Sequence, residues 1–325
     1  MSLSSGFSGA SRSGSAPLEV VLRRGCIQES VHRVHAVVCD GRGRVLMSSG
    51  QSGYETFIRS ALKPFQALPF LSSGAAAAME VGDRGIAISC ASHSGSIAHA
   101  REAFKLLWNA ELDADHLQCP VPSGGDSPLQ HNCSGKHAAF LATSRKMAWP
   151  LDTYLQSDHP LQVEVNRRVA ELLGLPADEL VAARDDCGAP TLRLQLAQMA
   201  LLYAHLGASR QAELEQISRA MLAHPDLVAG DGRFDTELMR RSHGQVLSKG
   251  GAEGIQCLSR VGKDLGVAIK VEDGSRRAKQ AVALHLLRQL EWLTPLGLEE
   301  LEEQVLIVNP GVSLEVQGAL RFQQS

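Results

Sequence analysis

The sequence has 325 residues, 44% of them hydrophobic, which is enough to bury a full core. Its 32 basic and 35 acidic residues are interspersed, with a formal net charge of -3, and no basic run is typical of a nucleic-acid-binding surface. No window approaches the roughly 20 consecutive apolar residues of a membrane-spanning helix, and residues 1–16 lack the apolar segment of a secretion signal. We therefore expect neither a nucleic-acid partner nor a membrane, and the seven widely spaced cysteines indicate a reducing cytoplasm.

The N-terminal part of the chain is predicted to form strands. Residues 1–16 are rich in Ser and Gly, cannot bury apolar surface and are expected to form a disordered tail. Short β-branched runs then predict strands, with a hairpin turn at Gly41-Arg42-Gly43. The predicted strands cover residues 18–23, 33–40, 43–49 and 85–90.

The middle of the chain changes to the three- and four-residue apolar spacing of helices, at 158–175, 190–207 and 211–222. A strand at 265–271, a turn at Glu272-Asp273-Gly274, a helix at 279–293 and a last strand at 303–310 follow. Strands at both ends with helices between them predict an α/β fold, an α+β sandwich whose sheet comes from both termini with an inserted helical lobe. We expect one domain over 17–325, with a sheet lobe at 17–100 and 240–325 and a helical lobe at 101–239.

A serine and a lysine stand three residues apart in FIRSALKPFQALP. On a helix, Ser60 and Lys63 would share one face, so the hydroxyl and the amine can meet. A lysine can take the serine proton only if burial or another cation lowers its pKa from about 10.4. Such a pair is also common on solvated helices, so this motif alone leaves both interpretations open.

Two further polar segments are candidates for the same site. Ser92, His93 and Ser94 follow a predicted strand, where α/β sheets expose catalytic groups, although small residues there also serve close packing. Lys249 precedes two glycines, which allow a close approach of the backbone to a ligand. The order of Ser-x-x-Lys, a serine loop and Lys-Gly-Gly resembles that of serine β-lactamases and penicillin-binding proteins.

Cysteine, histidine and acidic side chains gather in two short stretches, HNCSGKHAAF and ARDDCGAP. Thiolates, imidazoles and carboxylates are zinc ligands, but neither stretch has Cys-x-x-Cys spacing, and free buried cysteines are the other interpretation. The acidic pair, Asp185 and Asp186, also suits a substrate ammonium.

Seven segments together resemble the Rhizobium etli type of L-asparaginase, also called class 3 or thermolabile: RVHAVV, RSALKPFQALP, CASHSGS, NCSGKHAAFL, DDCGAPT, HPDLVAGDGRFDT and KGGAEG. The matching segments run from about Leu18 to Glu272 in the same order and with similar spacing. The resemblance implies a serine β-lactamase-type fold, a homodimer, and two Ser-Lys pairs beside a zinc ion. By position, the pairs are Ser60 with Lys63 and Ser92 with Lys249.

The resemblance also implies a zinc site formed by Cys133, Lys136 and Cys187, with Asp185 holding a metal-bound water. Residue chemistry alone would select His137 instead of Lys136, because a lysine ligand must be neutral. The chain departs from the family at Asp186, where the family has glycine. This substitution adds a charge and removes a residue that tolerates positive φ.

We therefore expect an L-asparaginase. Ser60, deprotonated by Lys63, would attack the side-chain amide of L-asparagine and release ammonia, and water would hydrolyse the β-aspartyl ester. Ser92 and Lys249 would relay protons, and the Ser60 N–H would be one oxyanion donor. Zinc would orient the substrate. The α-ammonium and α-carboxylate of the substrate are expected near three residues: Arg59, His137 and Asp185.

Two kinds of alternative remain at this stage. One is a glutaminase, or a β-lactam or peptide hydrolase, on the same scaffold, because a fold does not fix a substrate. The other is a non-catalytic, zinc-dependent amino-acid-binding protein with inert Ser-Lys pairs. Ammonia release from a panel of amides separates the first group, and the absence of both an acyl-enzyme and turnover would favour the second.

Overall fold

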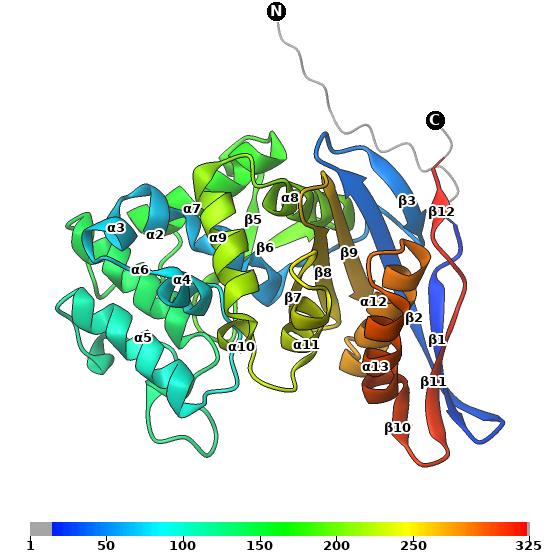
Figure 1. The fold of residues 1–325 in the computed structure, drawn as a ribbon. Helices are drawn as coiled ribbons and strands as arrows, with labels where there is room; N and C mark the ends of the chain where they lie inside the picture. Colours follow the sequence, from blue (N-terminus) through cyan, green and yellow to red (C-terminus); the bar gives the residue numbers. More distant parts are fainter. Residues whose placement is uncertain (1–14, 324–325) are drawn as a thin grey trace, which may run out of the picture.

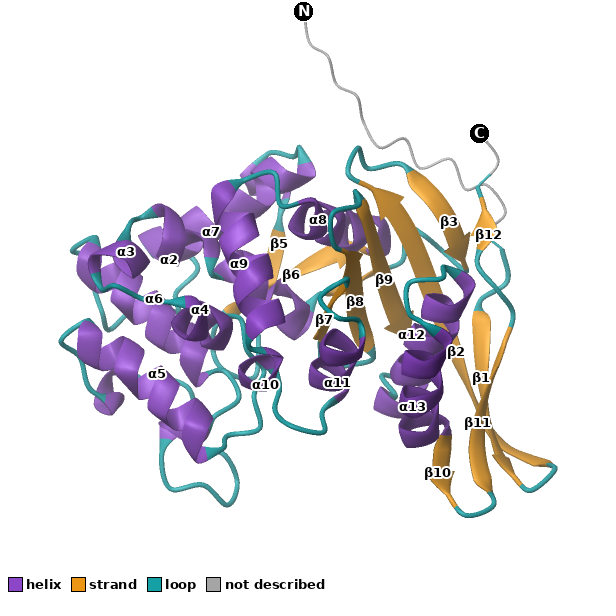
Figure 2. Ribbon diagram, in the orientation of Figure 1, coloured by secondary structure: helices purple, strands orange, loops and turns teal. Residues whose placement is uncertain are grey.

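The computed structural model describes residues 15–323, and a nine-stranded sheet organises one side of the molecule (Figures 1 and 2). The strand order is β10-β11-β1-β2-β9-β8-β7, with β3 beside β2 and β12 beside β3, and every pairing is antiparallel. The strands are β1 (Leu18–Arg24), β2 (Ile27–Asp40), β3 (Val45–Ser49), β7 (Val246–Gly250), β8 (Ile255–Arg260), β9 (Leu265–Val271), β10 (Ile307–Asn309), β11 (Val312–Gln317) and β12 (Arg321–Phe322). The sheet thus joins both ends of the chain, as predicted.

Helices cover both faces of this sheet. Alternate residues of β2 point to opposite faces, so Val37 packs toward α8 (Leu196–Ala208) and Val38 toward α12 (Arg276–Gln289). Gly266 of β9 permits the close approach of α8, because a Cβ there would lie 2.0 Å from the carbonyl oxygen of Ala200. On the other face, α13 (Pro295–Leu306) packs against α12 and β11.

Most of the remaining helices form a lobe beside the sheet with its own hydrophobic cluster (Figure 1). The remaining α-helices are α1 (Lys63–Gln66), α2 (Leu68–Ser72), α3 (Ala75–Ala78), α4 (Asp83–Ser89), α5 (Ile97–Asn109), α6 (Ser134–Lys146), α7 (Pro160–Leu173), α9 (Ala212–Ala223), α10 (Pro225–Val228) and α11 (Phe234–Arg241). Of these, α11 packs against β7 of the large sheet. Short 3-10 helices are η1 (Arg59–Leu62), η2 (Ala114–His116), η3 (Pro128–Gln130) and η4 (Ala177–Glu179). A small sheet, β4-β6-β5, comprises β4 (Glu55–Phe57), β5 (Val181–Arg184) and β6 (Pro190–Gln195). The helices begin at Arg59, well before the predicted start of the helical lobe at 101.

Most of the predicted elements are confirmed. The strands at 18–23, 33–40, 43–49 and 265–271 correspond to β1, β2, β3 and β9, and the turn at Gly41-Arg42-Gly43 joins β2 to β3. The helices at 158–175, 211–222 and 279–293 correspond to α7, α9 and α12. The mixed α/β fold class, with a sheet from both termini and helices inserted between, is also confirmed.

Three predicted elements are wrong, wholly or in part. Residues 85–90 lie largely in helix α4, because a short apolar run buried on all sides has no periodicity that separates strand from helix. The predicted helix at 190–207 begins only at Leu196, because residues 190–195 form strand β6, in which Leu192 and Leu194 are buried. Residues 303–306 end helix α13, and only 307–309 of the predicted last strand join the sheet.

The predicted disordered tail falls mostly outside the described residues. Ser15 and Ala16, its last two residues, are held against the sheet: Gly50 N donates to Ser15 O at 3.0 Å and Ser49 Oγ to Ala16 O at 2.8 Å. Between residues 15 and 323, we find no helix with the length and apolar character required to cross a membrane.

Candidate active site

Ser60 lies in a turn whose backbone is held in an unusual conformation. Arg59, just before it, has a φ of +53°, a conformation that costs a non-glycine residue on the order of 1–3 kcal/mol and that tends to occur at functional sites. Arg59 N donates to Thr191 Oγ1 at 3.1 Å, and Ile58 N donates to Leu192 O at 3.0 Å. Within residues 15–323, neither the backbone N–H nor the Oγ of Ser60 has a hydrogen-bond partner.

Lys63 is buried, with 1% of its surface exposed, and its amine has three acceptors. Nζ lies 2.6 Å from Ala91 O, 3.2 Å from Asn132 O and 3.0 Å from Ser92 Oγ. A protonated amine has three N–H groups for these acceptors. A neutral amine satisfies the two carbonyls and leaves its lone pair for the serine proton. Lys63 is thus hydrogen-bonded to Ser92, and Lys63 and Ser60 form no hydrogen bond with each other.

Lys249, at the end of β7, contacts the same serine from the other side. Its fully buried amine donates to Ser92 Oγ at 2.7 Å and to Gly250 O at 2.9 Å. Burial, reinforced by the positive charge of Lys63, lowers the pKa of Lys249 to about 7. The predicted pair of Ser92 with Lys249 is therefore formed, and Ser92 bridges two buried lysines.

The two glycines after Lys249 bring β7 against the turn that carries Ser60. A Cβ at Gly251 would lie 3.0 Å from the carbonyl oxygen of Ile58. At Gly250, a Cβ would lie 3.0 Å from Lys279 Nζ. The Lys-Gly-Gly motif is thus a close-packing motif between the sheet and the Ser60 turn.

The loop after α4 fixes Ser92 through its backbone and through a neighbouring histidine. Ser92 N donates to Val228 O at 2.8 Å. The His93 ring contacts Ser134 Oγ at 3.0 Å and stacks on His99 with 4.7 Å between ring centroids. Burial, and then the adjacent His99, lower the pKa of His93 well below its usual value. A neutral His93 therefore serves as a rigid support for this loop.

The predicted zinc ligands lie close together in the helical lobe. Cys133, Lys136 and Cys187 are all buried, and Lys136 Nζ lies 3.1 Å from Cys187 Sγ. The neighbouring Cys187 lowers the pKa of Cys133 well below its usual value against the opposing effect of burial, and the positive charge of Lys63 contributes.

His137, a predicted substrate-binding residue, lies fully buried on α6. Its Nδ1 is 2.7 Å from Tyr154 Oη, and its buried Nε2 has no hydrogen-bond partner among residues 15–323. Burial lowers its pKa to about 4. The structure does not expose this side chain beside Ser60, and its nitrogen without a partner is a potential metal donor.

Two of the predicted zinc ligands, Cys133 and Cys187, carry thiols, which are ordinary zinc ligands. In the described part of the chain, no three His, Cys, Asp or Glu side chains are grouped so that they could hold a metal. A zinc site at Cys133 and Cys187 would therefore need Lys136 as a third ligand, and only a neutral amine can coordinate. Burial lowers the pKa of Lys136, but the neighbouring Cys187 and Cys133 outweigh it and raise that pKa above its usual value, which favours the charged form.

Arg59 joins the Ser60 turn to the loop that carries Cys187. Its Nε lies 2.8 Å from Asp185 Oδ1, and its terminal nitrogen lies 2.7 Å from Asp186 Oδ2. Asp186, where the family has glycine, is 90% exposed at its side chain and is not among the residues with positive φ. Gly188 has a φ of +90° instead, so Asp186 adds a carboxylate to the site without straining the loop.

Some contributors to the site were missed by sequence analysis. Ala91 and Asn132 bind Lys63 through main-chain carbonyls, which no side-chain pattern reveals. Asp235 lay in a matching segment, but nothing in its spacing indicated that it binds residues on both sides of Lys249.

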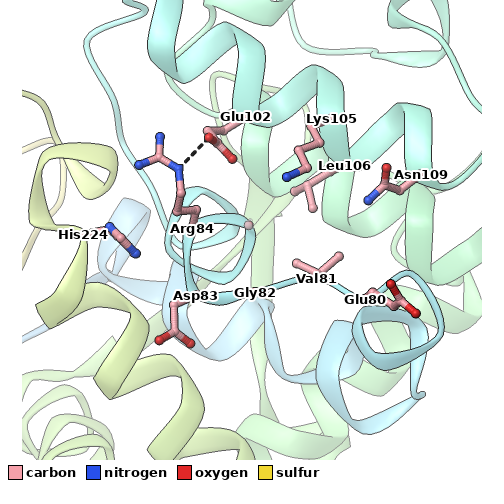
Figure 3. A pocket seen from close by; sticks show the side chains of 11 residues that line it. Glu80, Val81, Gly82, Asp83, Arg84, Glu102, Lys105, Leu106, Asn109 and His224 are labelled. Atoms are coloured by element: carbon pink, nitrogen blue, oxygen red, sulfur yellow. Dashed lines mark hydrogen bonds and ion pairs between the residues drawn. The ribbon is translucent and has the colours of Figure 1, made fainter.

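A separate cavity of about 160 Å³ lies at the beginning of α4, the opposite end of this helix from Ser92 (Figure 3). Arg84 and Glu102 form an ion pair at 2.6 Å within it, with Lys105, Asn109 and His224 nearby. The cavity contains none of the predicted site residues.

The Ser92 hydroxyl lies within hydrogen-bond distance of two buried lysines, and the pKa of one of them, Lys249, is lowered to about 7, so the group can exchange protons near neutral pH. The chain belongs to the L-asparaginase II family, whose profile matches residues 20–322.

No match was found among curated proteins. Among solved structures, Mglu in its native form is 13% identical, with a TM-score of 0.42, and the alignment covers 80% of this chain and 64% of that one. The chain thus spans less than two thirds of that Mglu chain. Bacillus glutaminase in the presence of 4.3 M NaCl is also 13% identical, with a TM-score of 0.35 and coverage of 80% and 91%.

Proposed function

We propose that this chain hydrolyses the side-chain amide of L-asparagine to L-aspartate and ammonia through an acyl-enzyme on Ser60. The observation that carries the proposal is the bridge of Lys63, Ser92 and Lys249, in which two buried amines lie within 3.0 Å of one hydroxyl oxygen. Two lysines this close disfavour a double positive charge, so one amine is available as a base near neutral pH.

Ser60 is a better nucleophile in this geometry than Ser92. The Ser60 N–H, free of any acceptor in residues 15–323, is available for the oxyanion of the tetrahedral intermediate. By contrast, the Ser92 N–H is bound to Val228 O, and its hydroxyl is engaged by both lysines. Ser92 is therefore suited to passing protons.

The proposed reaction has two steps. Ser60 Oγ attacks the amide carbon while its proton passes to Lys63, and the C–N bond breaks as the leaving nitrogen receives a proton through Ser92 and Lys249. Water then adds to the β-aspartyl ester, releases aspartate and returns a proton to Ser60. The absence of a Ser60–Lys63 hydrogen bond is compatible with this route, because catalytic hydrogen bonds often tighten only with substrate bound.

Substrate recognition is assigned to charged groups around the Ser60 turn. Arg59 suits the α-carboxylate, and Asp185 with Asp186 suits the α-ammonium, because each pairing joins opposite charges in a partly buried site. His137, which lies near Cys187, would support the loop that carries Asp185 and Asp186. Zinc, held by Cys133, Lys136 and Cys187, would supply a fixed positive charge that orients the substrate.

Three further assignments belong to this proposal. Glutamine is the main alternative substrate, since a family assignment does not fix the length of the side chain accepted. The resemblance to class 3 enzymes supports a homodimer, which light scattering would measure. The number and spacing of the cysteines support a cytoplasmic location, which cell fractionation would test.

The test measures ammonia release from asparagine and glutamine, and ring opening of a β-lactam, by the wild type and by Ser60→Ala and Ser92→Ala. We expect turnover of asparagine that is abolished in Ser60→Ala and strongly slowed in Ser92→Ala. Wild-type turnover of the β-lactam alone would contradict the proposal, and full activity of Ser60→Ala would reject its nucleophile.

A further inference from the structure

Asp235, near the start of α11, binds the strand that carries Lys249 from behind. Its Oδ1 accepts from Ser248 Oγ at 2.6 Å and from Gln256 Nε2 at 2.8 Å, and its Oδ2 accepts from Gly250 N at 2.8 Å. Ser248 and Gln256 are buried, so both carboxylate oxygens are engaged by enclosed donors.

The geometry of a β-strand explains why these contacts matter to Lys249. Successive side chains of a strand point to opposite faces, so Ser248 and Gly250 face Asp235 while Lys249 faces Ser92. One carboxylate therefore holds the two residues that flank Lys249, on the side opposite the amine. A shift of either neighbour would move Nζ relative to the Ser92 hydroxyl.

Asp235 also places a negative charge behind a group of buried lysines. Lys279 Nζ donates to Gly251 O at 2.6 Å and to Ile255 O at 3.0 Å, so it anchors the same turn. Gly250 lies between the two charges, because a Cβ there would lie 3.0 Å from Lys279 Nζ and 3.3 Å from Asp235 Oδ2. An alanine at position 250 would crowd both groups.

We propose that Asp235 is a positioning residue for Lys249, fixing the backbone on both sides of it and balancing the positive charge of the buried lysines around Ser92. This inference rests on the proposed function in one respect only, that Lys249 relays protons through Ser92.

Six charged or titratable groups lie near Lys249 on the packed elements: Lys63 of α1, Asp235 of α11, Lys279 of α12, Cys133 just before α6, Cys90 just after α4 and Cys257 of β8. Burial raises the pKa of the Cys90 and Cys257 thiols, which keeps them neutral. The two lysines lower the pKa of Lys249, whereas Asp235 and Cys133 raise it. Removing the carboxylate of Asp235 should therefore lower the pKa of Lys249 further, whichever protonation state the reaction requires.

The test compares Asp235→Asn with two controls in the full-length protein. Ser248→Ala removes one hydrogen bond to the carboxylate and keeps its charge. Asp231→Asn removes an exposed carboxylate that pairs with Arg240 at the surface. The pKa of Lys249 is read by NMR from lysine labelled with ¹³C at Cε, assigned by Lys249→Met, and kcat and KM for asparagine are measured across pH.

For Asp235→Asn we expect a lower pKa of Lys249, a shift of the corresponding limb of the pH-rate profile to lower pH, and a kcat reduced about 10- to 100-fold with little change in KM. Ser248→Ala should lower kcat by a smaller factor at an unchanged pKa, and Asp231→Asn should match the wild type. A folded Asp235→Asn with the wild-type pKa and kcat would overturn the proposal. An unchanged kcat in Ser248→Ala would overturn its positioning part, even if Asp235→Asn does not fold.

The NMR titration separates this inference from the proposed function. If the wild type turned over no amide, the proposed function would fail, and the pKa of Lys249 in Asp235→Asn would still decide whether Asp235 sets the charge of that lysine.

Discussion

Lys249 Nζ lies 2.7 Å from Ser92 Oγ, although 157 residues separate the two in sequence. One comes from the last strand of the sheet order and the other from a loop of the helical lobe, so the contact exists only when both parts are packed together. The same serine oxygen lies 3.0 Å from Lys63 Nζ. The catalytic proposal depends on this three-residue bridge.

Because the pKa of Lys249 is lowered on folding, the free energy of unfolding should be smaller at neutral pH than at high pH. The pKa falls from 10.5 to about 7 on folding, so between these values the unfolded chain binds more protons and stability rises with pH. Relative to that of Lys249→Met, the free energy of unfolding of the wild type should rise by up to about 1.4 kcal/mol per pH unit in this window. Denaturant unfolding at pH 7 and pH 9.5 would measure it, with the exposed Lys105→Met as the control for a lost lysine. A difference independent of pH would refute the lowered pKa.

Ser60→Ala should abolish amide turnover and leave the protein folded. The hydroxyl makes no hydrogen bond in residues 15–323, so its loss should cost at most about 1 kcal/mol of stability. Steady-state ammonia release and thermal unfolding would be compared with the wild type. Retention of a tenth of the activity would remove Ser60 as the nucleophile.

Cys187→Ser should lose bound zinc and raise KM more than it lowers kcat, because the metal is assigned to orienting the substrate. Metal content by mass spectrometry and the two kinetic constants provide independent measurements. Cys39→Ser is the matched control, since Cys39 is also buried and its thiol donates a hydrogen bond to the backbone carbonyl of Ala197, away from the predicted zinc ligands. Wild-type protein purified without stoichiometric zinc would show that the zinc assignment is wrong.

Asparagine should be preferred over glutamine. A methylene alone is discriminated by about 1–3 kcal/mol, but here it would also pull an α-group away from Arg59 or from Asp185, leaving a charge without its partner. The ratio of kcat/KM values should therefore reach about 200-fold or more. Comparable kcat/KM values would favour the glutaminase alternative.

The sequence was sufficient to predict the fold class because the patterns at both ends of the chain are regular. The β-branched runs in 33–40 and 265–271 predict strands that in fact pair with each other as β2 and β9. The segment 85–90 was misassigned because it is buried on every side, and burial without alternation does not separate helix from strand.

The candidate site was only partly predictable for a different reason. Motif order brought Ser60, Lys63, Ser92 and Lys249 into one hypothesis, but spacing along a helix did not reveal the hydrogen bond between Lys63 and Ser92. The amine turns to Ser92 because the carbonyls of Ala91 and Asn132 hold it there, and such contacts depend on packing between distant segments. Asp235 was missed because its importance comes from the strand that it binds.

The most direct test of the account is the identity of the acylated residue. Rapid acid quenching of the wild type during turnover of asparagine should trap a covalent aspartyl group, and peptide mapping by mass spectrometry would locate it. The account predicts the added mass on the peptide that contains Ser60, absent from Ser60→Ala. An aspartyl group on Ser92, or turnover of asparagine with no trapped ester on any serine, would contradict it.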